Sequence, residues 1–250
     1  MDHRLEPERG ALNRDGTGYV MLRLVRPDST DGTYVFVTAK HVFEDIAGDT
    51  ATLVLRRRSA NGDTIPYLQP LPIRKNKVPL YTAHPTADVA VIDVAIPSDS
   101  TLAEIGSNIT NVNWLATDDF LKSIGIHPGD ELMCLGYPYG NPTNDAYYPL
   151  LRSGKIASYP ILPSKKAEKI LYDFHVDDGD SGGPVYFSYT SRPFNQGLAL
   201  GKTYQKIFGL VTQKLTVVGA ADPYIGVIVP SVYIKETIDL LAGFESKPTP

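Results

Sequence analysis

The chain has 250 residues, of which 42% are hydrophobic, and its 24 basic and 28 acidic side chains leave a formal net charge of −4. This composition predicts a globular protein with one large core or two small packed cores, and the near balance of charge excludes nucleic acid as an expected partner. Cys134 is the single cysteine, which excludes an internal disulfide and a thiolate metal cluster and permits a reducing compartment.

The first 17 residues form a charged segment that begins MDHRLEPERGALNRDG and contains no apolar stretch. A signal peptide or a membrane anchor requires such a stretch. We therefore expect a polar leader, a protein of the cytoplasm and no membrane contact.

Short runs of β-branched and aromatic residues, separated by Gly, Pro, Asn and Asp, dominate the rest of the chain. This pattern is typical of antiparallel strands and turns, and ten or more strands suit a pair of β-barrels. Residues 56–58 are three arginines at the end of one run, where strand alternation predicts a solvated end. The ten expected strands are residues 18–25, 33–39, 51–57, 88–94, 131–137, 150–158, 169–176, 183–188, 207–213 and 224–230.

One long helix is expected after Pro230, with Ser231 as its N-cap and Ile234, Ile238 and Leu241 on one face. A polar stretch of mixed signals separates two groups of strands, and we place the boundary near residue 115. The expected organisation is a leader (1–17), a first barrel (18–115), a second barrel with the helix (116–243) and a tail (244–250), with the two barrels forming one unit.

The segment DDGDSGGPV, residues 177–185, places Ser181 among glycines. A serine hydroxyl is a weak nucleophile until an imidazole takes its proton and a carboxylate orients that imidazole. All five histidines precede Ser181, whereas an α/β-hydrolase with the same Gly-x-Ser-x-Gly spacing needs its histidine after the serine. A subtilisin-type order of Asp, His, Ser would require alternating helices and parallel strands, which the sequence does not show. The order His, Asp, Ser remains.

Two upstream residues fit the remaining roles. His41 follows an apolar strand in FVTAKHVF, and Asp88 stands at the mouth of the buried strand DVAVIDV. A carboxylate there is costly to desolvate unless it accepts hydrogen bonds, for example from an imidazole. Each residue alone has an ordinary structural interpretation, as a core histidine, a strand-end acid or a turn serine. Together they predict a triad of His41, Asp88 and Ser181.

The segments TAKHV, DVAVIDV and GDSGGPV, in that order, resemble the three signature segments of trypsin-like (chymotrypsin-fold) serine proteases. GTGYVM, ELMCLGYPYG, LLRSGKIAS, GLVTQ and IGVIVP extend the resemblance over nearly the whole chain, nearest to an HtrA-type protease domain without a PDZ domain. The resemblance implies an all-β fold of two packed six-stranded antiparallel β-barrels with a C-terminal helix. It implies His41 as general base and acid, Asp88 as its orienting carboxylate and Ser181 as nucleophile.

The activity implied by the resemblance is that of a serine endopeptidase with restricted targets, which hydrolyses a protein or peptide through an acyl-enzyme without a cofactor or metal. The alternative is a catalytically silent binding or regulatory module on the same fold. By the same resemblance, the backbone N–H groups of Gly179 and Ser181 form the oxyanion hole, because a side chain would obstruct the conformation that aims them. His175 would lie at the floor of the primary specificity pocket, with Thr212 and Gly226 on its walls.

Asp180, directly before the nucleophile, departs from the pattern of the digestive relatives. There the corresponding acid pairs with a cleaved N-terminus that begins Ile-Val-Gly-Gly, which this sequence lacks. We expect either a cation of the second barrel, Arg152 or Lys155, or backbone N–H groups to take that place. Proteolytic activation is then unnecessary. Order in the catalytic loop would be set by substrate, by an activating protein partner or by the tyrosine-rich loop 136–149, which could equally pack on itself.

Overall fold

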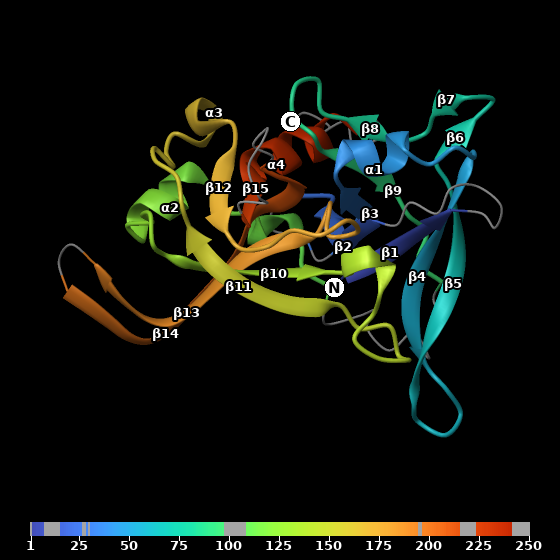
Figure 1. Cartoon of the computed structure of the whole chain (residues 1–250), viewed down its shortest axis with the longest axis horizontal. Coiled ribbons are helices and arrows are strands. Elements are labelled where there is room, and N and C mark those ends of the chain that lie inside the picture. Colours follow the sequence, from blue (N-terminus) through green and yellow to red (C-terminus); the bar gives the residue numbers. More distant parts are fainter. Residues whose placement is uncertain are drawn as a thin grey trace.

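The structure is a computed structural model that describes residues 2–7, 16–26, 29, 31–97, 109–194, 197–215 and 224–241. It is mostly β, and its strands form two units that follow one another along the chain (Figure 1). All ten expected strands are present, with ends that differ from the expected ones by a few residues, except that the β13 and β14 strands are much longer.

The first unit is a seven-stranded sheet with the strand order β5-β4-β1-β2-β3-β9-β8, antiparallel throughout. Residues 2–7 of the expected leader form its strand β1, which pairs with both β2 and β4, so the sheet begins before residue 18. Its strands are β1 (Asp2–Pro7), β2 (Gly16–Leu24), β3 (Gly32–Thr38), β4 (Thr50–Arg58), β5 (Thr64–Pro72), β8 (Thr82–Ala83) and β9 (Ala90–Asp93), while β6 (Arg74–Lys75) and β7 (Val78–Pro79) form a separate pair.

The second unit is a closed barrel of six antiparallel strands, in the order β10-β11-β12-β15-β14-β13. Within the described residues, pairing closes this barrel only, so one of the two expected six-stranded barrels is confirmed. The far ends of β13 and β14 extend beyond the barrel as a hairpin (Figure 1). The strands are β10 (Glu131–Gly136), β11 (Leu150–Ile156), β12 (Ile170–Asp173), β13 (Pro184–Phe194), β14 (Gly197–Lys214) and β15 (Ile225–Pro230).

The expected C-terminal helix is α4 (Ser231–Asp239), but Ser231 is not its N-cap. Pro230 occupies that position, and the Ser231 hydroxyl instead donates to the carbonyl oxygen of Ala116, which ties the helix to the segment between the units. No helix in the described residues is long and apolar enough to cross a membrane. The other helices are α1 (Lys40–Glu44), α2 (Asp118–Ser123) and α3 (Ser164–Ala167), with 3₁₀ turns η1 (Val112–Trp114) and η2 (Pro138–Gly140). The residues expected on the apolar face of α4 are buried: Ile234, Ile238 and Leu241.

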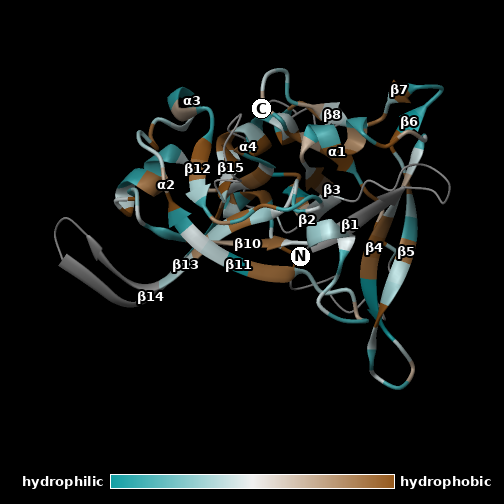
Figure 2. Cartoon of the chain, viewed as in Figure 1, coloured by the Kyte–Doolittle hydropathy of each residue, from teal (hydrophilic) through white to brown (hydrophobic). Residues whose placement is uncertain are grey.

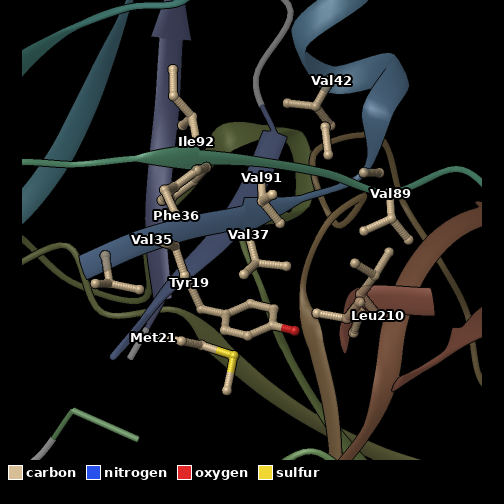
Figure 3. Close-up of a cluster of buried hydrophobic side chains, with 14 of the residues drawn as sticks. Tyr19, Met21, Val35, Phe36, Val37, Val42, Val89, Val91, Ile92 and Leu210 are labelled. Carbon is tan, nitrogen blue, oxygen red and sulfur yellow. The ribbon is translucent and has the colours of Figure 1, made fainter. Parts of the chain in front are cut away.

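Two hydrophobic cores correspond to the two units, and hydrophobic residues recur along the strands of both (Figure 2). The first core is built on β2, β3 and β9 and also contains Leu210 and Val229 from the barrel. Figure 3 shows Leu210 beside this cluster. The barrel therefore packs directly against the sheet, and α4 completes the same core. The second core, which includes the buried free thiol of Cys134, fills the barrel.

The arginines at the end of β4 differ from the expected solvated strand end. Arg58 is exposed and Arg57 is half-buried, but Arg56 is only 3% exposed. The expectation is wrong for Arg56 because the tyrosine-rich loop 136–149 of the second unit covers it: Arg56 donates to the Tyr137 hydroxyl and to the Tyr147 carbonyl oxygen.

Candidate active site

His41 and Asp88, the first two residues of the predicted triad, lie in direct contact. The register of β3 with β9, which places Thr38 opposite Ala90, brings the ends of these strands together. His41 Nδ1 lies 2.7 Å from Asp88 Oδ2, and the backbone N–H of His41 donates to Oδ1 over 3.1 Å. Both carboxylate oxygens are therefore held by the same histidine, and the side chains stay about one third exposed (36% and 32%).

A second histidine supports the turn before Asp88. His84 is buried, and its Nδ1 accepts the backbone N–H groups of Thr86 and Ala87 over 3.2 and 2.9 Å. Its Nε2 lies 3.3 Å from a carboxylate oxygen of Glu236 on α4. Since Nδ1 is the acceptor, Nε2 carries the proton and donates to Glu236. The turn before Asp88 is therefore tied to the C-terminal helix.

The His41–Asp88 pair shifts both pKa values in the directions expected of an ion pair. Burial alone would lower the pKa of His41, but the hydrogen bond and the charge of Asp88 outweigh it and raise that pKa above 6.5. Burial would raise the pKa of Asp88, but the His41 hydrogen bond and charge, with backbone N–H groups of His41 and Lys40, lower it below 3.8. The contact therefore favours an imidazolium beside a carboxylate.

The loop that carries Ser181 crosses from the barrel to the end of β3, just before the helix α1 that carries His41. The N–H of Thr17 on β2 donates to the Ser181 carbonyl oxygen over 2.9 Å. Gly182 has φ +88°, and a Cβ there would lie 2.2 Å from Thr38 Oγ1 and 3.0 Å from the Ala39 nitrogen. Only glycine permits this approach. The Ser181 loop thus packs closely against the end of β3 that leads into His41.

The Ser181 hydroxyl itself donates to the carbonyl oxygen of Thr212 on β14 over 2.9 Å. The structure therefore brings the three predicted triad residues to one region, with His41 bonded to Asp88 and Ser181 bonded to Thr212. Hydrogen bonds within catalytic groups are often looser without substrate. The role of each residue stays a prediction.

Two backbone amides in this loop, those of Gly179 and Ser181, donate to no acceptor in the part of the chain that the structure describes. The peptide carbonyls on the other side of each plane are bonded: Tyr139 N–H donates to Asp178 O, and Gly183 N–H donates to Asp180 O. Because a trans peptide points its N–H opposite to its C=O, both free N–H groups point away from these contacts. Gly179 has φ +96°, and a Cβ there would lie 2.2 Å from the Tyr137 carbonyl oxygen.

Asp180 pairs with Arg152, one of the two cations predicted for that role. Arg152 Nη1 lies 3.0 Å from Asp180 Oδ2, and the Asp177 N–H donates to the same oxygen over 2.9 Å. Both expected kinds of partner, a barrel cation and a backbone amide, are thus present. Burial nevertheless raises the pKa of Asp180 to about 6, with the Asp177 amide and Arg152 opposing the rise.

Asp177 is a half-buried partner of several groups. It lies 3.1 Å from Arg152 Nη2 and 2.8 Å from His175 Nε2, and it accepts the Tyr139 hydroxyl over 2.8 Å. Burial opposes ionisation, but the Tyr139 hydroxyl, His175 and Arg152 together lower its pKa below 3.8. Asp177 is therefore a member of a packed polar cluster and not a solvated loop acid.

Of the residues predicted for the specificity pocket, Thr212 and Gly226 lie on the paired strands β14 and β15, and His175 lies in the loop after β12. The His175 ring is tilted by 44° against the Tyr224 ring, with 4.6 Å between their centroids, and its buried Nδ1 has no hydrogen-bond partner among the residues that the structure describes. Thr212 is buried beside Ser181, and its hydroxyl donates to the Val227 carbonyl oxygen. A Cβ on Gly226 would lie 2.7 Å from a methyl of Val176, so Gly226 is closely packed. Their place in a substrate pocket stays a prediction.

Sequence reasoning missed Thr17, which is buried on β2 and contacts the loop twice. Besides the bond to Ser181, its hydroxyl donates to the Gly179 carbonyl oxygen over 2.6 Å. A threonine between two glycines, as in GTGYVM, gives no sign of such a role. Among the described residues, no group of three His, Cys, Asp or Glu side chains is placed to hold a metal ion.

Comparison with known proteins gives little to add to this geometry. No family model and no curated protein matches the chain. Among solved structures, one described as the HtrA-type protease AlgW with decapeptide matches with a TM-score of 0.47 and 16% sequence identity, over 95% of this chain and 64% of that chain. This chain thus spans a little under two thirds of the length of that protein. A likeness this weak identifies neither a family nor an activity.

Proposed function

We propose that the protein is a serine endopeptidase of the trypsin-like class, with His41, Asp88 and Ser181 as its triad. The observation that carries the proposal is the His41–Asp88 pair, held through both carboxylate oxygens at 2.7 and 3.1 Å. With Asp88 at Nδ1, the neutral ring keeps its proton there and presents Nε2 as a base. The order of the three sequence motifs and the packing of Gly182 against Thr38 support the assignment.

In the proposed reaction, Ser181 Oγ attacks the carbonyl carbon of a peptide bond and its proton passes to His41 Nε2. The carbonyl oxygen gains the negative charge, which the N–H groups of Gly179 and Ser181 stabilise. His41 then gives its proton to the departing amine, which leaves Ser181 as an ester. Water, deprotonated by His41, hydrolyses that ester and restores the hydroxyl.

The proposed fold of this peptidase is the packed pair of barrels, its substrates are peptides or proteins with restricted sequences, and its compartment is the cytoplasm. The one cysteine, Cys134, is a buried free thiol, so the described fold needs no disulfide. We infer that Arg152 supplies the positive charge that Asp180 requires, and that no cleaved N-terminus is needed. The support is the 3.0 Å contact between them inside the barrel.

A second candidate function, a catalytically silent binding or regulatory module, is favoured by one observation. The Ser181 hydroxyl donates to the Thr212 carbonyl oxygen over 2.9 Å and would have to rotate toward His41 before attack. Rotation about the Cα–Cβ bond of a partly exposed serine is fast and inexpensive. We therefore rank this candidate second.

A fluorophosphonate probe separates the two functions, because it reacts only with a serine that is activated and lies beside an oxyanion hole. We expect one probe per chain on Ser181, found by peptide mass mapping, and loss of peptide hydrolysis by about 10⁴-fold or more in both Ser181→Ala and His41→Ala. Ser59→Ala, which replaces a half-buried serine in the turn between β4 and β5, is the matched control and should behave as the wild type. An unlabelled wild-type chain that binds peptides without cleaving them would establish the silent module instead.

A further inference from the structure

We propose that Thr17 and Arg56, both on the seven-stranded sheet, are positioning residues that fix the oxyanion hole by holding Tyr137 at its two ends. The proposal rests on the proposed function and extends it. Neither residue would touch the substrate. Each would act through the turn η2 (Pro138–Gly140), which lies against Gly179.

Tyr137 is the residue through which the seven-stranded sheet is hydrogen-bonded to the turn. It directly follows β10, is 1% exposed and belongs to the second unit, yet both of its polar ends are bonded to the first. Its backbone N–H donates to Thr17 Oγ1 over 3.1 Å. Its hydroxyl accepts from Arg56 Nη1 over 2.9 Å and donates to the Tyr147 carbonyl oxygen over 2.8 Å.

The Thr17 hydroxyl links the turn to the catalytic loop. It accepts a hydrogen bond from the Tyr137 N–H and donates one to the Gly179 carbonyl oxygen over 2.6 Å, while the Thr17 N–H donates to the Ser181 carbonyl oxygen. A hydroxyl has one donor and two acceptor sites, so a single buried group serves both segments. Valine has nearly the same shape and would break both contacts.

Arg56 holds the C-terminal end of the tyrosine-rich loop 136–149. Its guanidinium donates to the Tyr147 carbonyl oxygen over 2.8 Å and lies 4.9 Å from the centre of the Tyr148 ring. A buried guanidinium is costly to desolvate, and these bonds repay that cost only while the loop stays in place. The loop and the sheet are therefore coupled through Arg56.

The turn η2 sets the direction of the Gly179 N–H. Tyr139 N–H donates to Asp178 O, which orients the peptide plane that carries the Gly179 N–H. Gly179 and the turn are closely packed, since a Cβ on Gly179 would lie 2.2 Å from the Tyr137 carbonyl oxygen and 3.0 Å from the Gly140 backbone nitrogen. A displaced turn would therefore release the amide. Because an oxyanion donor acts on the transition state, this loss should appear in kcat more than in KM.

The kinetic test uses two matched pairs of variants and a peptide substrate that the wild type cleaves. Thr17→Val and Arg56→Gln should lower kcat by about 10²–10³-fold, the usual effect of removing one oxyanion donor, with little change in KM. Thr17→Ser keeps the hydroxyl and should rescue the activity. Arg58→Gln removes an exposed arginine from the end of the same strand and should behave as the wild type.

A second arm needs no activity. In a Ser181→Ala background, hydrogen exchange of the Tyr139 and Gly140 amides should be faster in Thr17→Val and Arg56→Gln than in Thr17→Ser and Arg58→Gln, with each variant measured well below its own thermal midpoint. If Arg56→Gln does not fold, Tyr137→Phe removes the hydroxyl that it contacts and keeps the ring. Unchanged exchange, or a kcat loss shared by the control variants, would overturn the proposal. An inactive wild type with the expected exchange pattern would contradict the proposed function alone.

Discussion

Replacing Arg152 by methionine should leave the carboxylate of Asp180 buried without its cation. Arg152 lies 3.0 Å from Asp180, whose side chain is 2% exposed, so water cannot take the place of the guanidinium. Removing one partner of a buried ion pair costs about 3–5 kcal/mol, and we expect the free energy of unfolding at about pH 7.5 to fall by that amount. Lys155→Met, which removes an exposed cation from the same strand, should change it by less than about 0.5 kcal/mol.

The loss of stability caused by Arg152→Met should be larger at high pH than at low pH. Burial raises the pKa of Asp180 from 3.8 to about 6, and Arg152 lowers it, so Arg152→Met should raise it further. An acid whose pKa is raised by folding makes its full contribution to stability below its unfolded-state pKa, and that contribution is lost as the pH rises through its folded-state pKa. Above about pH 6 the wild type ionises Asp180, whereas the variant keeps it protonated up to its own higher pKa, and each unit of additional pKa shift adds up to about 1.4 kcal/mol to the loss of stability. Below that pH both proteins protonate Asp180, and the difference between them should shrink.

Urea denaturation of the two proteins at a series of pH values measures this difference directly. Repeating it in an Asp180→Asn background completes a double-mutant cycle, in which the Arg152→Met penalty should become smaller. The remaining part belongs to the contacts of Arg152 with Asp177 and with the His175 carbonyl oxygen. A penalty that is independent of pH and equal in both backgrounds would show that Arg152 does not compensate Asp180.

Three further outcomes test the site. The value of kcat/KM should rise with pH through a midpoint above 6.5, because Asp88 raises the pKa of His41 and the ring must be neutral to act as base. Asp88→Asn should lower this midpoint and should lower kcat by about 10⁴-fold. A wild-type midpoint below 6.5 would contradict the assignment. Gly179→Ala should abolish probe labelling, since φ is +96° and a Cβ would lie 2.2 Å from a carbonyl oxygen, whereas Gly129→Ala, at φ +90° with open space, should be labelled normally. A folded, uncleavable domain fused ahead of Met1 should leave labelling unchanged; a dead fusion that cleavage between residues 1 and 18 restores would show that a free N-terminus is required.

The strands could be predicted where their pattern was apolar and continuous, and they were missed where it was interrupted. β5 contains prolines at positions 66, 70 and 72, which argue against a central strand. The structure places β5 at the edge of the sheet, where a missing N–H leaves fewer pairings unmet. β1 was missed because its six residues, DHRLEP, are mostly polar. Neither pattern tells whether a group of strands closes into a barrel, because closure depends on pairing between strands far apart in the chain.

The predicted site residues carry local sequence signals, and the residues that support them do not. Arg152 was predicted only because the acid before Ser181 needed a cation. Thr17 lies 162 positions from Gly179, and Arg56 lies 81 positions from Tyr137, so no local spacing could reveal either contact. Alternation along β4 predicted an exposed strand end, and a loop from the other unit covers it instead. Tertiary contact decided the burial of Arg56.

The contacts of the turn at residues 137–140 predict that the turn opens cooperatively, as one unit. Displacing it would break three hydrogen bonds together, because the Thr17 hydroxyl, the Asp178 carbonyl and the Arg56 guanidinium are each bonded to Tyr137 or to Tyr139. Each buried polar group left unpaired costs about 1–3 kcal/mol, so a partial displacement saves little of the total. The Tyr139 and Gly140 amides should then exchange with one shared opening free energy. Two clearly different opening free energies would mean that the turn frays residue by residue, and the oxyanion geometry would then be graded rather than all-or-none.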